Sequence, residues 1–264
     1  MTITNLHTWI EAGKAKPLYA DGSGLNPPDT WVSPIHRYFC MTIPKTACSK
    51  IKFVLQELEG LPLPPDPFDV HVRNTPGYRF VPSLTDFATA EGVDILTSDD
   101  WFRFAFVRNP YSRLFSAYKQ KVLDLTSPYI DFREAIRQHA GYPTPPDGAL
   151  GCVGFADFVH YIATQPDELR DGHWKSQIGT LHLDVIQYNF IGRVETFEQD
   201  FTQVLQRFQA PPALLATLSE RVNTTVKLPL AVAYNKALAD LVYTLYRADF
   251  ATFGYAQDSW MFMD

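Results

Sequence analysis

The chain has 264 residues, 46% of them hydrophobic and 14% aromatic, which is enough apolar material for a large buried core and predicts one domain over residues 1–264. Its formal net charge of −6 excludes the broad basic surface that draws proteins onto nucleic acids or strongly anionic membranes, so any anion site must be built locally. No apolar run reaches the ~18 to 20 residues that cross a bilayer, and residues 1–16 lack the apolar core of a secretory signal, so we expect neither a membrane span nor a signal peptide.

The first predicted unit is a strand followed by a loop and a helix. Residues 35–43 are rich in β-branched and aromatic side chains and predict the strand, and apolar residues recur at helical spacing from Ser49 until Gly60 stops the helix. The loop between them carries Lys45 and a series of small residues. Backbone N–H groups and the positive end of the helix dipole face outward in such a loop, which suits a phosphate. The structural alternative is a plain turn with an exposed lysine.

A second unit follows at residues 101–107, a nearly continuous apolar run typical of a strand buried on both faces. Arg108 comes directly after it, and Pro110 is well placed in the first turn of a helix that is predicted to reach Leu123. An arginine at a strand end and a serine in the next helix, here Ser116, can grip a phosphate through charge-assisted hydrogen bonds.

The third unit is a strand over residues 185–192 and a helix to about Phe208, opened by a capping box that begins at Thr196. The remaining pattern predicts helices at 132–139 and 155–164, a surface loop at 141–151 and a mainly helical C-terminal part at 214–253. Strands that alternate with helices predict an α/β fold in which a parallel β-sheet is flanked by helices on both faces. Ligands of such sheets bind at the carboxyl ends of the strands.

The loop at 44–50 and the segment at 106–118 together resemble the nucleotide-binding motifs of sulfotransferases that use 3′-phosphoadenosine-5′-phosphosulfate (PAPS). The similarity is to the carbohydrate sulfotransferase group that includes the chondroitin and heparan 2-O-sulfotransferases. It continues in the expected order through three further segments, 173–174, 188–196 and 245–255. The resemblance covers about residues 35–255, leaves 1–34 as an N-terminal extension, and implies the P-loop-NTPase-like sulfotransferase fold.

The resemblance also implies the roles of the residues in the donor site. Lys45 is expected to contact the phosphosulfate and to stabilise charge on the departing 5′-phosphate. Further donors of hydrogen bonds are expected from the residues after it, Thr46, Ala47, Cys48, Ser49 and Lys50. The Ser49 hydroxyl is expected close to the phosphate, and a role as N-cap of the helix is a compatible alternative. Arg108 and Ser116 are expected to bind the 3′-phosphate, and Arg193 is expected to line the pocket.

Transfer to a hydroxyl needs a base, for which histidine is the usual residue near neutral pH. His71 lies in a segment that resembles the one carrying the base in 2-O-sulfotransferases, so it is the first candidate for catalysis and for acceptor binding; a structural histidine is the alternative. His173 is the second candidate, and with Trp174 it is expected to bind the acceptor or to be structural.

The resemblance implies a sulfotransferase that moves the sulfuryl group of PAPS to a hydroxyl of a carbohydrate and releases adenosine 3′,5′-bisphosphate, without a metal. A nucleotide kinase is disfavoured because the loop contains no glycine. A non-catalytic module that binds the bisphosphate or a glycan, and a sulfotransferase for a non-sugar small molecule, stay open. The three cysteines are odd in number and form no C-x-x-C pair, which favours a cytoplasmic location over a disulfide framework or a zinc site.

Overall fold

The structure, a computed structural model, describes residues 3–14, 29–66, 69–73, 77–143, 151–219 and 229–263. The chain divides into two compact units. The first consists of residues 1–108 and 177–225, and the second of residues 109–176 and 226–264. The expectation of a single domain over residues 1–264 therefore stays a prediction.

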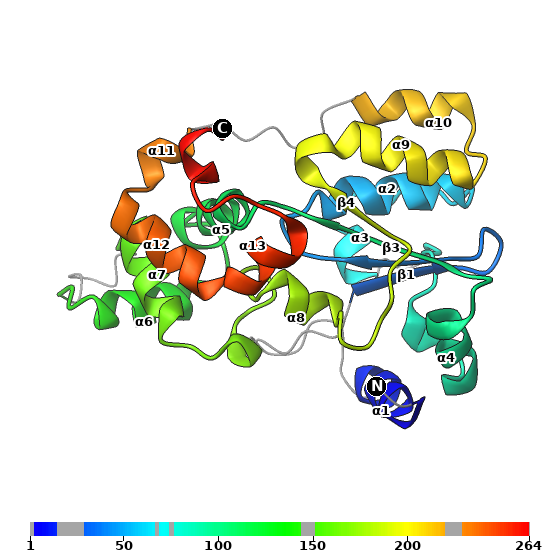
Figure 1. The fold of residues 1–264 in the computed structure, drawn as a ribbon, viewed down its shortest axis with the longest axis horizontal. Coiled ribbons are helices and arrows are strands. Elements are labelled where there is room, and N and C mark those ends of the chain that lie inside the picture. Colours follow the sequence, from blue (N-terminus) through cyan, green and yellow to red (C-terminus); the bar gives the residue numbers. More distant parts are fainter. Residues whose placement is uncertain are drawn as a thin grey trace. The chain divides into compact units, whose positions relative to one another are not determined.

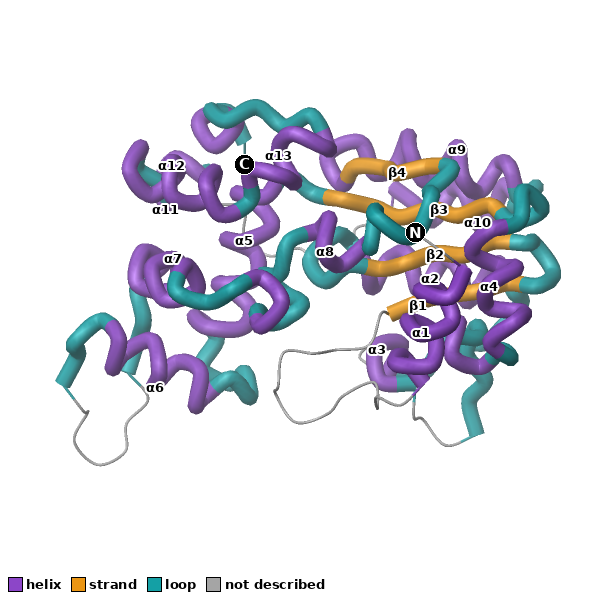
Figure 2. Tube along the Cα trace, turned by 60° about the horizontal axis from the view of Figure 1, so that its bottom comes forward, coloured by secondary structure: helices purple, strands orange, loops and turns teal. Residues whose placement is uncertain are grey.

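The first unit is built around a four-stranded sheet in which the strands follow one another in chain order (Figure 2). Its strands are β1 (Asp29–Ser33), β2 (Tyr38–Thr42), β3 (Phe102–Val107) and β4 (Phe190–Arg193). Strands β2, β3 and β4 are parallel, with Phe104 paired to Cys40 on one side and to Phe190 on the other. Every residue of β2, and all but the first of β3, is buried, as expected for strands covered on both faces. The predicted α/β class is confirmed.

The first strand corrects the prediction of a wholly parallel sheet. β1 pairs with β2 in antiparallel register, with Trp31 opposite Cys40, and it lies inside the segment that we expected to be an extension. The predicted strand at 35–43 begins only at Tyr38, because a turn from Pro34 to Arg37 links the two strands. Pro34 cannot donate a ladder hydrogen bond, which favours a turn at this point.

Helices cover both faces of this sheet. Figure 1 shows α2, α9 and α10 on one side and α1 and α4 on the other. The helices of the first unit are α1 (Ile3–Lys14), α2 (Cys48–Leu58), α3 (Asp69–Val72), α4 (Thr89–Thr97), α8 (Gln177–Leu181), α9 (Phe197–Arg207) and α10 (Pro212–Ala216). The predicted helices after β2 and β4 are confirmed. Both helices are amphipathic, and their apolar faces pack on Phe104 and Phe106 of β3. The packed residues of the helices are Ile51, Val54 and Leu55 of α2 and Phe201, Val204 and Leu205 of α9.

The second unit is helical and has a core rich in aromatic rings. Its helices are α5 (Pro110–Tyr118), continued by a π-helical turn at Lys119–Leu123, then α6 (Ile130–His139), α7 (Phe155–Ala163), α11 (Leu230–Ala233), α12 (Lys236–Leu245) and α13 (Arg247–Phe253). The helices predicted from pattern in this part are confirmed. Of the predicted surface loop at 141–151, residues 144–150 lie outside the described residues, as do residues 220–228 of the predicted C-terminal helical part.

The capping box predicted at Thr196 is wrong. α9 begins at Phe197 without a side-chain cap from Thr196. The Thr196 hydroxyl instead donates to the Asp200 carboxylate at 2.8 Å, and the same oxygen accepts the Arg193 N–H at 2.7 Å. A 3₁₀ turn over Val194–Thr196 precedes the helix. Asp200, in the first turn of α9, thus connects the end of β4 to the helix through these two hydrogen bonds.

Candidate functional site

The loop after β2 has an unusual backbone for a segment without glycine. Lys45 has a φ of 72° and Ala47 a φ of 59°, both in the left-handed region that non-glycine residues seldom adopt. Thr46 between them is fully buried, and its hydroxyl donates to the Ile43 carbonyl at 2.9 Å, which braces the turn. Strained residues of this kind persist only where the surroundings hold them, and they concentrate at ligand sites.

The loop ends in the N-terminus of α2, with Ala47 as the N-cap residue. The Ala47 carbonyl accepts from the Ile51 N–H at 3.1 Å, so the N–H groups of Cys48 and Ser49 have no acceptor inside the helix. A left-handed residue followed directly by a helix turns successive N–H groups toward one concavity, which is a common anion-binding arrangement. Ser49 lies inside the first turn, so its predicted role as N-cap is wrong.

Two of the predicted loop donors have other partners. The Thr46 N–H lies 3.4 Å from the Ile43 carbonyl oxygen, inside the turn. The Lys50 ammonium donates to the Thr217 carbonyl at 2.5 Å and so ties α2 to the segment after α10. The backbone donors that the geometry leaves for a ligand are therefore concentrated at Cys48 and Ser49.

Arg108 follows β3 and lies beside this loop, because β2 and β3 are parallel neighbours and end at the same edge of the sheet. Its guanidinium donates through Nη1 to the Lys45 carbonyl at 3.3 Å. Arg193 ends β4, in register with Val107 of β3, and its side chain is exposed at this edge. The structure thus brings together the three predicted cations Lys45, Arg108 and Arg193 within the first unit.

Gln177 is a site residue that sequence reasoning missed. It is fully buried at the start of α8, and its amide oxygen accepts the Arg108 N–H at 2.8 Å while its amide nitrogen donates to the Arg108 carbonyl at 2.8 Å. The amide thus holds the backbone of Arg108 as a neighbouring strand would. No local pattern marks this residue, since its partner is 69 positions earlier in the chain.

His71 lies on α3 and contacts two residues of the donor-loop helix. Its Nε2 lies 2.9 Å from the Ser49 hydroxyl and its Nδ1 lies 2.9 Å from the Lys52 ammonium. Lys52 is fully buried and forms an ion pair with Asp29 at the start of β1. His71 is therefore placed next to the loop, as expected, but both of its ring nitrogens already have partners in the protein.

Asp29 is the anionic end of this cluster. Besides Lys52, its carboxylate accepts from the Trp31 indole at 3.1 Å and lies 3.7 Å from the Arg73 guanidinium. Burial by itself raises the pKa of Asp29, but the charges of Lys52 and Arg73 and the hydrogen bonds outweigh it, so the pKa is lowered. Asp29 is thus held as a carboxylate.

The remaining predicted residues belong to the second unit. His173 donates or accepts through Nδ1 at 2.6 Å from the Asp171 carboxylate, which also accepts from the Tyr129 hydroxyl at 3.0 Å. Arg113 of α5 fixes this turn by donating to the carbonyls of Gly172 and Lys175 at 2.8 and 2.7 Å. Arg113 is buried, so its role in this turn is structural.

Trp174 and Ser116 have different surroundings in that unit. Trp174 is only 1% exposed and stacks on Phe132 with ring centroids 4.6 Å apart, so its ring is closed to solvent and is part of the core. Its predicted contact with an acceptor has no support in this packing. Ser116 lies on α5, in a different unit from Arg108, and the pairing of these two residues stays a prediction.

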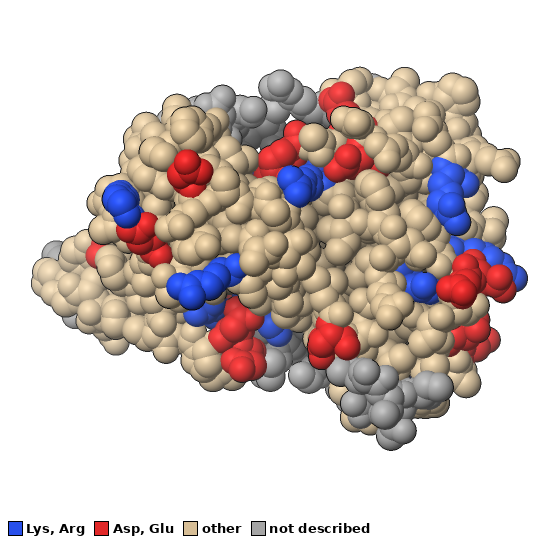
Figure 3. Space-filling view, in the orientation of Figure 1, with Lys and Arg blue, Asp and Glu red and all other residues tan. Residues whose placement is uncertain are grey.

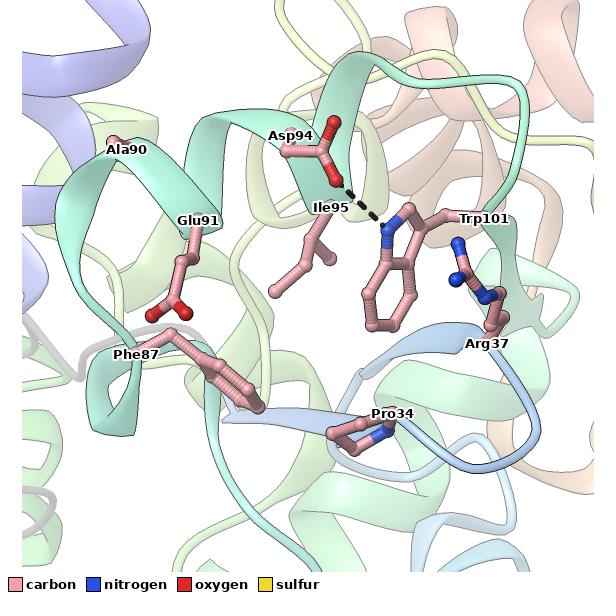
Figure 4. Close-up of a pocket in the computed structure, with 8 residues that line it drawn as sticks. All are labelled: Pro34, Arg37, Phe87, Ala90, Glu91, Asp94, Ile95 and Trp101. Atoms are coloured by element: carbon pink, nitrogen blue, oxygen red, sulfur yellow. Dashed lines mark hydrogen bonds between the residues drawn. The ribbon is translucent and has the colours of Figure 1, made fainter.

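A surface pocket lies elsewhere on the first unit (Figure 4). It is lined by Pro34, Arg37, Phe87, Ala90, Glu91, Asp94, Ile95 and Trp101, and the Trp101 indole donates to Asp94 at 3.2 Å. Arg37 and Trp101 come directly before β2 and β3, whereas Lys45 and Arg108 come after the same strands. The pocket is therefore at the opposite edge of the sheet from the candidate site.

Two properties of the described residues bear on cofactors and membranes. Within the described ranges, His, Cys, Asp and Glu side chains form no group of three or more that is arranged to hold a metal ion. The helices of the same ranges are all too short or too polar to cross a bilayer. The three cysteines, Cys40, Cys48 and Cys152, are all unpaired.

Comparisons with known proteins agree with the geometry. The sequence model of the sulfotransferase family matches residues 28–256. Carbohydrate sulfotransferase 14 of Danio rerio is 30% identical over 227 residues, which are 83% of this chain and 60% of the relative. Carbohydrate sulfotransferase 14 of Homo sapiens is 30% identical over 181 residues, 69% of this chain and 46% of the relative. Carbohydrate sulfotransferase 11 of Mus musculus is 26% identical over 239 residues, 87% of this chain and 67% of the relative.

The chain spans about half to two thirds of the length of these relatives. No solved structure gives a significant match. The family match extends from the residue before β1 through α13, and so includes the loop after β2, Arg108 and the turn that carries His173. This chain belongs to the sulfotransferase family.

Proposed function

We propose that the protein transfers the sulfuryl group of PAPS to a hydroxyl of a carbohydrate acceptor and releases adenosine 3′,5′-bisphosphate. One observation carries the proposal most directly: the glycine-free loop with left-handed Lys45 and Ala47 opens α2 beside Arg108. Family membership and the names of the relatives, carbohydrate sulfotransferases 14 and 11, support the reaction class and the acceptor class.

The loop fits the phosphosulfate end of the donor. The Cys48 and Ser49 N–H groups and the positive end of α2 favour an anion at this point. Lys45 adds a full positive charge next to them. PAPS supplies an activated sulfuryl group on a phosphate leaving group, and the part of Lys45 is to stabilise the negative charge that grows on that phosphate. Stabilisation of developing charge by preorganised groups is often the largest single contribution to catalysis.

Arg108 is proposed to bind the 3′-phosphate. Its guanidinium presents several donors in a planar fork that matches phosphate oxygens, and the Gln177 amide fixes its backbone. Arg193, at the end of the neighbouring strand, adds a third positive charge to the same edge. A site that demands a 3′-phosphate distinguishes PAPS from nucleotides that lack this group.

The proton of the acceptor hydroxyl needs a base, and two histidines are candidates. His71 lies next to the donor loop with both nitrogens engaged, by Ser49 and by Lys52. His173 contacts the Asp171 carboxylate through Nδ1 at 2.6 Å. A carboxylate on the far nitrogen is the usual device for orienting a histidine base.

An acceptor of modest charge fits the surface. On the face shown in Figure 3, Lys and Arg side chains are interspersed with Asp and Glu and separated by uncharged surface. Long polyanionic chains are usually bound along continuous basic tracks. The net charge of −6 likewise favours a weakly charged sugar chain or glycolipid over a highly sulfated polymer. A cytoplasmic location is part of the proposal, and the three unpaired thiols support it.

A transfer assay tests the proposal. The protein is incubated with PAPS labelled in its sulfuryl group and with a panel of neutral glycans, glycosaminoglycans, glycolipids and phenols. Label on a sugar, released by mild acid as sulfate, supports the function. Label only on phenols or other small molecules reassigns the acceptor class, and binding of PAPS without transfer to any acceptor favours a non-catalytic module.

A further inference from the structure

His71 is held between two side chains of one helix face. Ser49 and Lys52 are three residues apart on α2, so their side chains lie on the same face of the helix. The imidazole bridges them, with Nε2 at 2.9 Å from the Ser49 oxygen and Nδ1 at 2.9 Å from the Lys52 nitrogen. The orientation of the ring is thereby fixed from both ends.

The partner of Nδ1 is a charged ammonium. Lys52 is fully buried, and it forms an ion pair with the Asp29 carboxylate. Asp29 is fixed in turn by the Trp31 indole at 3.1 Å and by Arg73 at 3.7 Å. The ammonium of this ion pair can only donate hydrogen bonds.

This contact determines the tautomer of the imidazole. Nδ1 faces a group that can only donate, so it must be the nitrogen without a proton. In the neutral ring the proton is then on Nε2, which donates to the Ser49 oxygen. Since Ser49 accepts this bond, its own O–H proton points away from His71 and is available to another acceptor. Ser49 is in the first turn of α2, where the proposed phosphate site lies.

We propose that Lys52 and Asp29 hold His71 as a neutral imidazole protonated on Nε2, and that His71 is a positioning residue that aims the Ser49 hydroxyl at the donor phosphate. This inference rests on the proposed function. The lone pair of His71 is occupied by Lys52, so His71 is not the base of the reaction. Each hydrogen bond of the chain from Lys52 through His71 to Ser49 donates toward the phosphate, which is an acceptor only.

Two substitutions at one position separate a positioning role from that of a base. The amide nitrogen of glutamine can take the place of Nε2 and donate to Ser49, but it cannot accept a proton near neutral pH. His71→Ala should weaken the affinity for adenosine 3′,5′-bisphosphate by about 10- to 100-fold, the range for a lost hydrogen bond to a charged group. His71→Gln should restore the affinity and kcat to within about fivefold of the wild-type values. His160→Gln, at an exposed histidine of α7, is the matched control.

Loss of kcat in both variants with unchanged affinity for the bisphosphate would overturn the inference. If His71 is the base, both variants lose kcat by roughly 10²- to 10⁴-fold, and the bisphosphate binds to them as it does to the wild type. The wild-type protein also distinguishes this failure from a failure of the proposed function. If the wild type binds no bisphosphate at all, the proposed function is wrong. If it binds the bisphosphate and both variants lose kcat while keeping the wild-type affinity, only the inference is wrong.

A spectroscopic measurement reads the protonation of the His71 ring in the wild-type protein directly. The ¹⁵N shifts of the His71 ring, assigned by comparison with His71→Gln, report which nitrogen carries the proton. We expect an unprotonated Nδ1 and a protonated Nε2 near neutral pH. A protonated Nδ1 would show that Lys52 is not its donor and would overturn the inference.

Discussion

Gln177→Met removes a buried amide that holds the backbone of Arg108 in place. Methionine nearly matches glutamine in length and volume but can neither accept from the Arg108 N–H nor donate to its carbonyl, both now bonded at 2.8 Å. A polar group left unsatisfied in a buried site costs roughly 1 to 3 kcal/mol of folding free energy, so the loss of both bonds would cost about 2 to 6 kcal/mol if both groups were fully buried. Arg108 is only half-buried, which places the expected cost below the top of this range. We therefore expect a loss of roughly 2 to 4 kcal/mol.

Thermal unfolding followed by circular dichroism measures this loss. For chains of this size about 1 kcal/mol corresponds to a shift of 2 to 4 °C, so the midpoint should fall by roughly 5 to 15 °C. The affinity for adenosine 3′,5′-bisphosphate should fall as well, since the backbone that positions the Arg108 side chain is no longer held by the amide. Gln206→Met makes the same chemical change on the exposed face of α9 and should shift the midpoint very little. A Gln177→Met protein that melts and binds the nucleotide like the wild type would refute the proposed role of the amide.

Three further predictions concern the loop, the sheet and acid stability. Lys45→Ala should lower kcat by about 10²-fold or more but the affinity for the bisphosphate by less than tenfold, because the Lys45 charge mainly stabilises the phosphate as it leaves. Equal losses of kcat and of affinity would contradict this role. Gly192→Ala places a Cβ 2.4 Å from the Phe106 ring and should cost roughly 1 to 3 kcal/mol in urea unfolding, while Gly13→Ala, with an ordinary contact at 3.6 Å, should not destabilise. Burial raises the pKa of Asp29, but the neighbouring cations outweigh it and the pKa in the folded protein is lowered. The Asp29 carboxylate therefore contributes its full stabilisation above pH 3.8, the pKa in the unfolded chain, and loses it as the pH falls toward the lower pKa of the folded protein. Unfolding of Asp29→Asn should therefore depend less on pH between about 5 and 3, and an unchanged slope would show that the carboxylate is not held ionised.

The sequence was most informative where structure depends on local pattern. The run at 101–107 predicted a buried strand because its side chains are apolar on both faces, and the helix after it could be placed from Pro110. β1 was missed because Asp29 and Thr30 are polar, and because the strand is defined by its pairing with β2. Strand formation of this kind is decided by neighbours in space and not by the segment itself.

Contacts between distant segments could not be predicted. Asp29, Lys52 and His71 come from β1, α2 and α3, and only the folded unit brings a buried ammonium between a carboxylate and an imidazole. Sequence reasoning selected His71 correctly as a residue next to the donor loop, but the partners of its two nitrogens, on which its role depends, have no sequence signature. The Gln177 amide is a second example, since it acts on a backbone far away along the chain.

The central claim is that Lys45 and Arg108 belong to one site for a doubly phosphorylated adenosine. Isothermal titration calorimetry with adenosine 3′,5′-bisphosphate and, separately, with adenosine 5′-monophosphate tests it most directly. We predict binding of the bisphosphate to the wild type, at least ~10-fold weaker binding of the monophosphate, and a similar weakening of bisphosphate binding in Arg108→Ala, as expected for lost charge-assisted hydrogen bonds. Equal affinity for the two nucleotides, or no heat with the bisphosphate, would contradict the claim.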